Sequence, residues 1–380
     1  MKKICFITAV PMSAQAFLRD HMAALQKEFS VYYISGEPDC AKISVAHDGY
    51  HYINIQRGIS VKKDIKALWQ LYKYFRSEKF DSVHSVTPKA GLLTSIAAFF
   101  ARIPIRIHIF TGQVWANKSG LSRWTLKFMD KVIAHFDNRL LVDGEGQRQF
   151  LIQTGVLKES NSLVLGKGSI CGVNLERFSP SGVIRKEART ELKIEHSKIV
   201  FVFLGRLNHD KGLYDLMPAF DKLASERNDV YLLLFGNDEE HVASHFNEYH
   251  HLTPEVNFRY YGPTSEPQKM LQAGDVFVLP TYREGFGTSV IEASALGLPV
   301  ICSDAYGVMD AMVEGETGLR CKVGDSKSLY MAMKEFADSP ELRQKLGKGG
   351  RLRTIRDFDG RKMSQHWVDY YHQLFYDPNV

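Results

Sequence analysis

Two carboxylates with seven residues between them flank a glycine turn in the second half of the chain. Glu284 and Glu292 lie on either side of Gly285-Phe286-Gly287, and a helical pattern runs on from Thr288 to Leu296. An apolar segment typical of a buried strand, 276–279, precedes the turn. The free N–H groups and the dipole at such a helix start attract anions. With a carboxylate on each side to accept hydrogen bonds from hydroxyl groups, the segment predicts a site for a sugar nucleotide.

A basic segment in a similar setting occurs earlier in the chain. Gly205, Arg206, Lys211 and Gly212 follow an apolar strand pattern at 199–204. A planar guanidinium can bind two phosphate oxygens at once, whereas an ammonium group acts as a point charge. Taken singly, Arg206 fits an ordinary surface residue, and a glutamate at a helix start fits a simple dipole interaction. Because both segments follow a strand and carry complementary groups, we interpret them together as a diphosphate site.

These segments resemble the signatures of the retaining glycosyltransferases of family 4, which have the GT-B fold. The similarity includes the Glu-x7-Glu motif and the glycine-arginine…lysine-glycine segment. Further segments similar to landmarks of that family lie at 172–178, 297–304 and 313–319. The resemblance covers nearly the whole chain and is strongest from about residue 165 to residue 325.

The resemblance implies a role for each residue of the two motifs. Arg206 and Lys211 would neutralise the donor diphosphate, Glu292 would hold the ribose hydroxyls, and Glu284 would contact the transferred sugar. The implied donor-binding residues are Gly205, Arg206, Lys211, Glu284, Gly285, Phe286, Gly287, Thr288, Ser289 and Glu292. The implied catalytic residues are Arg206, Lys211, Glu284, His108 and Thr111.

The chain departs from the family pattern after its expected fourth strand. Many members have a His-Gly pair there, next to the transferred sugar, whereas this chain has Thr111-Gly112, with His108 three residues before Thr111. Either His108 or Thr111 could take that role, and His108 also fits a plain core histidine. The sequence Phe-Thr-Gly-Gln-Val-Trp at 110–115 resembles enzymes that build bacterial surface polysaccharides on polyprenyl diphosphate carriers.

Strand patterns alternate with helical patterns throughout, which predicts parallel sheets with crossover helices. The chain has 380 residues, which is more than a single hydrophobic core usually supports, so two domains are expected. The strand pattern restarts after about residue 198, and residues 180–182 fit a linker. The prediction is an α/β protein of the GT-B type, with two Rossmann-like parallel-sheet domains facing a cleft. Domains are expected at 1–178 (acceptor) and 179–355 (nucleotide-sugar), with a C-terminal helix, 356–380, either crossing back to the first domain or lying on the second.

Composition excludes several classes of protein. The content of hydrophobic residues, 44%, is too high for a disordered chain. The five cysteines are scattered without a Cys-x-x-Cys pair, which disfavours a zinc site or a disulfide framework and fits a reducing compartment. Asp357-Phe-Asp359 has the spacing of a metal-binding motif but no preceding strand, so we expect neither a metal nor another cofactor. No signal peptide or membrane span is evident, and a cytoplasmic location is expected.

The first half of the chain carries a net positive charge and the second half a net negative charge. Residues 1–180 hold 24 Lys and Arg against 14 Asp and Glu, whereas the rest hold 24 against 29. A basic amphipathic helix expected near 59–80 carries Lys62, Lys63, Lys66 and Trp69. Such a helix fits the cytoplasmic face of an anionic inner membrane, but also an ordinary helix that covers a sheet. Nucleic acid is a third possibility, which we reject because no binding motif accompanies the charge.

Two further loops are expected to reach the acceptor side of the cleft. The segment 8–14, with Ser13, and the segment 87–91, with Lys89, each follow a strand and open a helix. Gln113 lies just after the next expected strand. Together with the lysines near 62–66 and Trp69, these residues are the expected contacts of the acceptor or the membrane.

The predicted function is a retaining transfer of a sugar from a nucleotide-sugar to a polyprenyl-diphosphate-linked sugar in bacterial glycan assembly. A UDP-sugar is the expected donor, with UDP-N-acetylhexosamine among the candidates. No carboxylate pair is placed for double displacement, so front-face displacement without a metal is expected. The alternatives are a sugar-nucleotide 2-epimerase on the same fold and a non-catalytic sugar-nucleotide-binding protein.

Overall fold

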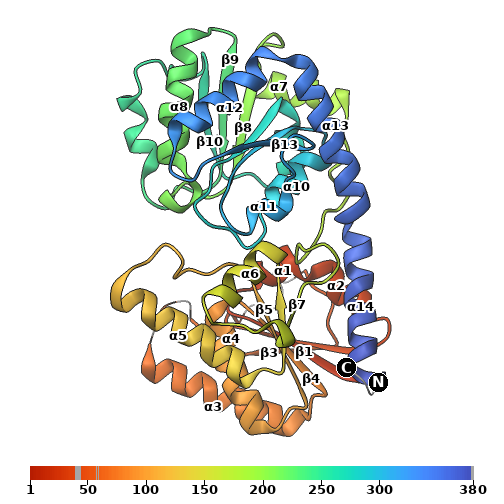
Figure 1. The fold of residues 1–380 in the computed structure, drawn as a ribbon. Helices are drawn as coiled ribbons and strands as arrows, with labels where there is room; N and C mark the ends of the chain where they lie inside the picture. Colours follow the sequence, from red (N-terminus) through yellow and green to blue (C-terminus); the bar gives the residue numbers. More distant parts are fainter. Residues whose placement is uncertain (39–43, 57, 59, 378–380) are drawn as a thin grey trace. The chain divides into compact units, whose positions relative to one another are not determined.

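The protein folds into two compact units. A computed structural model describes residues 1–38, 44–56, 58 and 60–377 (Figure 1). Unit 1 comprises Met1–Gly172 and Gly360–Val380, and unit 2 comprises Val173–Asp359. The chain therefore leaves unit 1 before residues 180–182, where the sequence suggested a linker. The reason is local pairing, since the amide of Val173 donates to the carbonyl of Phe358 at 2.8 Å and ties both segments to unit 2.

Unit 1 is built on a parallel sheet of seven strands in the order β3-β2-β1-β4-β5-β6-β7. Its strands are β1 (Lys3–Thr8), β2 (Ser30–Ser35), β3 (Gly49–Tyr52), β4 (Ser82–Val86), β5 (Ile105–Phe110), β6 (Arg139–Val142) and β7 (Ser162–Leu163). Its α-helices are α1 (Pro11–Phe17), α2 (Arg19–Leu25), α3 (Val61–Glu78), α4 (Pro88–Ala101), α5 (Gly120–Phe136), α6 (Glu145–Gln153) and α14 (Gly360–Tyr376).

Unit 2 is built on a parallel sheet of six strands in the order β10-β9-β8-β11-β12-β13. Its strands are β8 (Ile199–Leu204), β9 (Val230–Phe235), β10 (Phe258–Gly262), β11 (Val276–Leu279), β12 (Val300–Ser303) and β13 (Gly318–Cys321). Its α-helices are α7 (Gly182–Glu191), α8 (Leu213–Glu226), α9 (Pro267–Met270), α10 (Thr288–Ala295), α11 (Val308–Ala311), α12 (Ser326–Asp338) and α13 (Pro340–Asp357).

Each sheet reverses its strand order once, next to its first strand. In unit 1, β1 lies between β2 and β4, and in unit 2, β8 lies between β9 and β11. The loops that follow the two strands at such a reversal diverge to opposite faces of the sheet and leave a crevice at the carboxyl edge. The loops after β8 and β11 are the two motif segments of the sequence, so the topology brings them to one place.

The central strands of unit 2 are buried and largely apolar, as is typical of a parallel sheet whose two faces are covered by helices. All six residues of β9 are buried, as are all four of β11 and of β12. The edge strands differ. Most residues of β3 and β10 are half-buried or exposed, so their sequences lack the continuous apolar run that marks a central strand.

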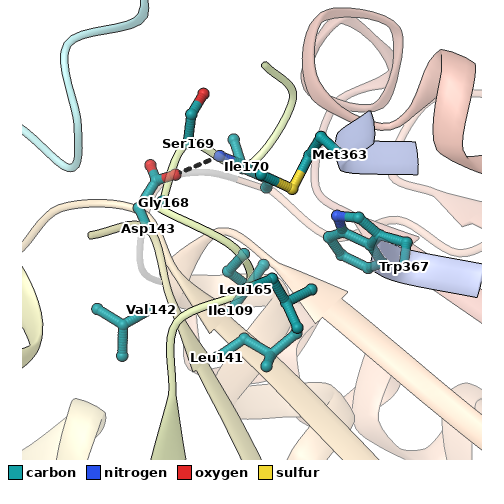
Figure 2. A pocket seen from close by; sticks show the side chains of 10 residues that line it. All are labelled: Ile109, Leu141, Val142, Asp143, Leu165, Gly168, Ser169, Ile170, Met363 and Trp367. Carbon is teal, nitrogen blue, oxygen red and sulfur yellow. Dashed lines mark hydrogen bonds between the residues drawn. The ribbon is translucent and has the colours of Figure 1, made fainter. Parts of the chain in front are cut away.

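The last helix, α14, packs against α2 within unit 1. Trp367 is fully buried, with its ring 5.1 Å from that of His21 and 4.7 Å from that of His84, both stacked. Burial lowers the pKa of His21 to about 4 and that of His84 well below its ordinary value, so both rings are neutral. Met363 and Trp367 of α14 line a cavity of about 10 Å³ together with Ile170, and Figure 2 shows these side chains. The helix thus completes the core of unit 1.

No helix in the described part of the chain has the length and apolar character required to span a bilayer.

Replacement of Trp367 by alanine should strongly destabilise unit 1. The change empties a fully buried site, and such truncations cost roughly 3–5 kcal/mol in the free energy of unfolding. Chemical denaturation followed by circular dichroism measures this loss. The control is Tyr376→Ala on the same helix, where the side chain is exposed. A loss for Trp367→Ala no larger than that of the control would contradict this account of the core.

Candidate active site

The two motif loops of unit 2 are joined through the backbone of Asp210. The carbonyl of Asp210 accepts hydrogen bonds from the amide of Tyr282 at 2.8 Å and from Oγ1 of Thr281 at 2.9 Å. Gly212 has φ of +74°, and a Cβ there would lie 2.0 Å from the carbonyl oxygen of Pro280. Only glycine therefore allows the two loops to approach this closely.

Lys211 and Glu284 meet where the two loops touch. The ammonium group of Lys211 contacts Oε1 of Glu284, and both side chains are about 85% buried. Asn208 fixes the preceding turn, because its side-chain oxygen accepts from the amide of Lys211 at 3.1 Å. One cation and one carboxylate, the two groups with assigned roles in the sequence motifs, thus share a partly desolvated position.

A second ion pair lies directly beside this contact. Arg283 donates to Oδ2 of Asp210 through Nε at 3.0 Å and through Nη2 at 2.6 Å. Asp210 precedes Lys211 and Arg283 precedes Glu284 in the chain. The Asp210–Arg283 pair therefore holds the backbone of both loops and fixes where Lys211 and Glu284 emerge.

The glycine turn presents the start of α10 to this site. Gly287 has φ of +88° and precedes the first residue of the helix. Phe286 is buried and packs edge-on against Phe358 with ring centroids 5.2 Å apart. Thr288 and Ser289 are half-buried in the first turn of the helix. Their amides belong to the unpaired donors of a helix start and can bind an anion.

Arg206 lies at the exposed side of the same loop. It follows Gly205, and its Nη1 donates to Oε2 of Glu239 at 2.8 Å. Both side chains are about half exposed, 52% for Arg206 and 41% for Glu239. An exposed pair of this kind is held weakly, so a phosphate group can replace Glu239 as the partner of Arg206.

Glu292 lies one turn into α10 and is half-buried. Its burial raises the pKa of the carboxyl from 4.5 to about 7, and the positive charge of Arg177 opposes this rise. A carboxyl with such a pKa changes charge near neutral pH. It accepts hydrogen bonds from ligand hydroxyls most strongly when it is ionised.

In unit 1, two of the expected acceptor residues, Ser13 and Lys89, follow the two strands at the corresponding strand reversal. Ser13 is half-buried in the first turn of α1, after β1. Lys89 is in the first turn of α4, after β4, and forms an ion pair with Asp64 at 2.7 Å. Thr87 just before it has φ of +79°, a rare value for a β-branched residue and typical of strained functional loops.

His108 and Thr111 have different environments. His108 is buried within β5, its Nδ1 lies 2.8 Å from Oγ of Ser85, and its ring fills the space beside Gly91. Burial lowers the pKa of His108 to about 3, so the ring is neutral. Thr111 follows the end of β5 and is half-buried. Thr111 therefore lies at the carboxyl edge of the sheet, whereas His108 lies inside it.

Gln113 and Trp115 anchor the loop after β5. Gln113 is buried and its side-chain oxygen accepts from Nε2 of Gln147 at 3.2 Å. Nε1 of Trp115 donates to Oδ2 of Asp130 at 2.6 Å. Burial raises the pKa of Asp130 to about 6, and the bond from Trp115 counteracts this rise.

The lysines expected at the acceptor or membrane side are exposed on α3. Lys62, Lys63 and Lys66 lie in its first two turns, and Trp69 follows them with 55% of its surface exposed. The residues that bury α3 against the sheet are on another face of the helix, namely Ala67, Leu71 and Phe75.

Sequence reasoning missed the residues that hold the motif side chains in place. Asp210, Arg283 and Glu239 received no role, although the first two are opposite charges next to Lys211 and Glu284 in the chain. That adjacency was the available signal for the Asp210–Arg283 pair. Glu239 lies after β9, and the sequence carried no signal for its role, because its contact with Arg206 depends on the order of strands in the sheet.

Among the described residues, no group of three or more His, Cys, Asp or Glu side chains is placed to hold a metal ion.

Comparisons with known proteins identify the family. The family described as "Glycosyl transferases group 1" matches residues 184–353, and the "Glycosyl transferase 4-like domain" matches residues 17–164. A capsular polysaccharide biosynthesis glycosyltransferase of Staphylococcus aureus, CapM, is 32% identical over 82% of this chain and 81% of its own. The chain belongs to this family of glycosyltransferases.

Other similar proteins add the fold and a set of relatives. HepE of Anabaena, solved with UDP and glucose, superimposes with a TM-score of 0.81 over 98% of this chain and 99% of its own, at 17% identity. This likeness shows that the glycosyltransferase has the GT-B fold. A Campylobacter jejuni relative is 26% identical over 82% of this chain and 81% of its own, and is named an N,N'-diacetylbacillosaminyl-diphospho-undecaprenol alpha-1,3-N-acetylgalactosaminyltransferase.

The carboxyl group of Glu292 should titrate near neutral pH. Burial raises its pKa to about 7, so the folded protein keeps a proton there that the unfolded chain loses near pH 4.5. The glycosyltransferase should therefore gain stability as pH falls from about 7 towards 4.5, relative to Glu292→Gln. Unfolding of both proteins at several pH values measures the difference, and carbon-13 NMR of labelled glutamate follows the carboxyl directly. A parallel pH dependence in the variant, or a midpoint near 4.5, would refute the assignment.

Proposed function

We propose that the protein transfers a sugar, with retention of configuration, from a UDP-sugar to a polyprenyl-diphosphate-linked sugar in the assembly of a bacterial surface polysaccharide. UDP-N-acetylhexosamines are among the candidate donors. The observation that carries the proposal is the contact between Lys211 and Glu284 beside the start of α10. Under this proposal, Lys211 would bind the diphosphate and Glu284 would accept hydrogen bonds from hydroxyls of the transferred sugar. The site would act at the cytoplasmic face of the membrane.

The names of the relatives support this choice of acceptor. CapM is named for capsular polysaccharide biosynthesis. The Campylobacter enzyme is named for a diphospho-undecaprenol acceptor. An Escherichia coli relative, 28% identical over 80% of this chain and 78% of its own, is named for transfer of galactose from UDP-galactose to such a carrier.

The proposed reaction breaks the bond between C1 of the donor sugar and the diphosphate oxygen. The acceptor oxygen forms the new bond to C1 on the same face, and its proton passes to the departing diphosphate. Lys211, Arg206 and the amides of Thr288 and Ser289 stabilise the charge of that leaving group. Stabilisation of a developing charge by preorganised donors is often the largest catalytic contribution, and these groups supply it from the protein itself.

The first experiment measures release of nucleoside diphosphate from a panel of UDP- and GDP-sugars, with a short polyprenyl-diphosphate-sugar acceptor and EDTA. Release from one donor that depends on the acceptor, and is lost in Glu292→Ala, would support the proposal and name the donor. NMR of the product reports whether configuration is retained. Conversion of a sugar nucleotide without release of nucleotide would instead indicate a 2-epimerase, and binding without any conversion would indicate a non-catalytic protein.

Removal of the Lys211 ammonium group should lower kcat by about a hundredfold to a thousandfold, the usual cost of losing one preorganised donor. The change is Lys211→Ala, with turnover measured under saturating donor. Lys345→Ala, an exposed lysine on α13, is the matched control and should leave kcat unchanged. Near-normal turnover in Lys211→Ala would remove this residue from the mechanism.

Loss of the Asp210–Arg283 pair should lower kcat/KM by roughly tenfold to a hundredfold, because a small misplacement of reacting groups is costly. Asp210→Asn and Arg283→Gln should each show the effect, and the double variant should lose no more than either single variant. Arg283→Lys should recover only part of the lost kcat/KM, since a lysine side chain cannot reproduce the two hydrogen bonds that the guanidinium group donates to Asp210. Lys269→Gln breaks an ion pair elsewhere in unit 2 and serves as the control. Additive losses would show that the two residues act separately.

A further inference from the structure

The glycine turn before α10 packs against the short helix α11. Gly307, just before α11, has φ of +83°, and a Cβ there would overlap with the carbonyl oxygens of Glu284 and Gly285. Val308, the first residue of α11, is fully buried, and its Cγ2 would lie 3.1 Å from a Cβ on Gly287. The position of α11 therefore limits where the glycine turn can lie.

A second support for the turn is the residue that follows α13. The ring of Phe286 packs edge-on against that of Phe358, and both rings are buried. Phe358 is itself held by its backbone, because its amide donates to the carbonyl of Thr354 at 2.9 Å and its carbonyl accepts from the amide of Val173 at 2.8 Å. Phe358 is the middle residue of the Asp-x-Asp segment noted in the sequence, so this segment helps to support the turn.

One side chain, that of Arg353 on α13, contacts both supports. Its Nη1 donates to the carbonyl of Ala311 at 2.8 Å and its Nη2 to that of Asp310 at 2.6 Å, and these are the last two residues of α11. Its guanidinium carbon lies 4.8 Å from the centroid of the Phe358 ring. Only 17% of the Arg353 side chain is exposed. A guanidinium group suits this position, because it can donate to two carbonyls at a helix end while it lies over an aromatic ring.

We propose that Arg353 is a positioning residue, which holds the glycine turn in place through α11 and through Phe358. It acts in this way on Glu284 and on the amides at the start of α10. That these groups bind a sugar diphosphate rests on the proposed function, whereas the support of the turn does not depend on it. Because a small misplacement of groups that contact a substrate is costly, loss of this support should lower the rate of the reaction.

The first measurement needs no substrate. Hydrogen–deuterium exchange followed by mass spectrometry compares wild type with Arg353→Gln at peptides that cover residues 284–296. Exchange there should become at least about tenfold faster, because two hydrogen bonds and the contact of a cation with an aromatic ring are lost. Phe358→Leu weakens one support, keeps the hydrogen bonds of Arg353 to α11 and should give a smaller increase. It serves as the second variant if Arg353→Gln fails to fold.

Arg343→Gln is the matched control. Arg343 lies on the same helix, and its Nη1 donates to the carbonyls of Phe336 and Ala337 in the last turn of α12. Loss of this contact should lower the overall stability by a similar amount yet leave exchange at residues 284–296 unchanged. Arg353→Lys keeps a cation and should recover part of the protection against exchange. Thermal denaturation checks that each variant is folded.

Turnover is the second measurement. With the donor that the release assay identifies, kcat/KM should fall about tenfold or more in Arg353→Gln and stay unchanged in Arg343→Gln.

Three outcomes would overturn the proposal. Equal exchange at residues 284–296 in wild type and Arg353→Gln would show that Arg353 does not support the turn. Equally faster exchange in both arginine variants would show a general loss of stability. Faster exchange in Arg353→Gln with normal kcat/KM would show that the reaction does not depend on this support. Selective exchange at the turn in a protein that turns over no sugar nucleotide would support the role of Arg353 and refute the proposed function alone.

Discussion

The hydrogen bonds that the carbonyl of Asp210 accepts from Thr281 and Tyr282 determine the geometry of the site in unit 2. They join loops that lie some seventy residues apart in the chain and leave adjacent strands of one sheet. Without this junction, Lys211 and Glu284 would belong to two independent loops. With it, a cation, a carboxylate and a helix start share one position. The absence of a side chain at Gly212 makes the close approach possible.

The charged side chains of the site in unit 2 differ in how far they are shielded from water and in how many hydrogen bonds they make. The Asp210–Arg283 pair makes two hydrogen bonds and is mostly shielded from water, which suits a fixed support. The pair of Arg206 with Glu239 makes one hydrogen bond and is about half exposed, which suits exchange of partner with a ligand. Burial of Glu292 raises the pKa of its carboxyl to about 7, although the positive charge of Arg177 opposes this rise. The site thus combines a shielded ion pair with an exposed one and with a carboxyl group whose pKa is raised by burial.

The two units use the same topology for different chemistry. Both sheets reverse direction beside their first strand, and both place loops at the resulting crevice. Unit 2 fills its crevice with paired charges and a helix start. Unit 1 has a strained Thr87 and exposed lysines on α3, and the hollow between α3 and α4 has largely apolar walls.

The sequence by itself determined the family, the alternation of strands and helices, and the motif residues of unit 2, because most of the buried parallel strands are largely apolar and the motifs are local. It missed the edge strands β3, β7, β10 and β13, since a strand paired on one side only is short and partly exposed. Only the tertiary structure decided that Asp210 pairs with Arg283 and that His108 lies inside its sheet rather than at the edge. It also decided that Ile65 and Trp69 are left out of the core. These facts depend on which strands are neighbours and which face of a helix meets the sheet, and long-range packing sets both.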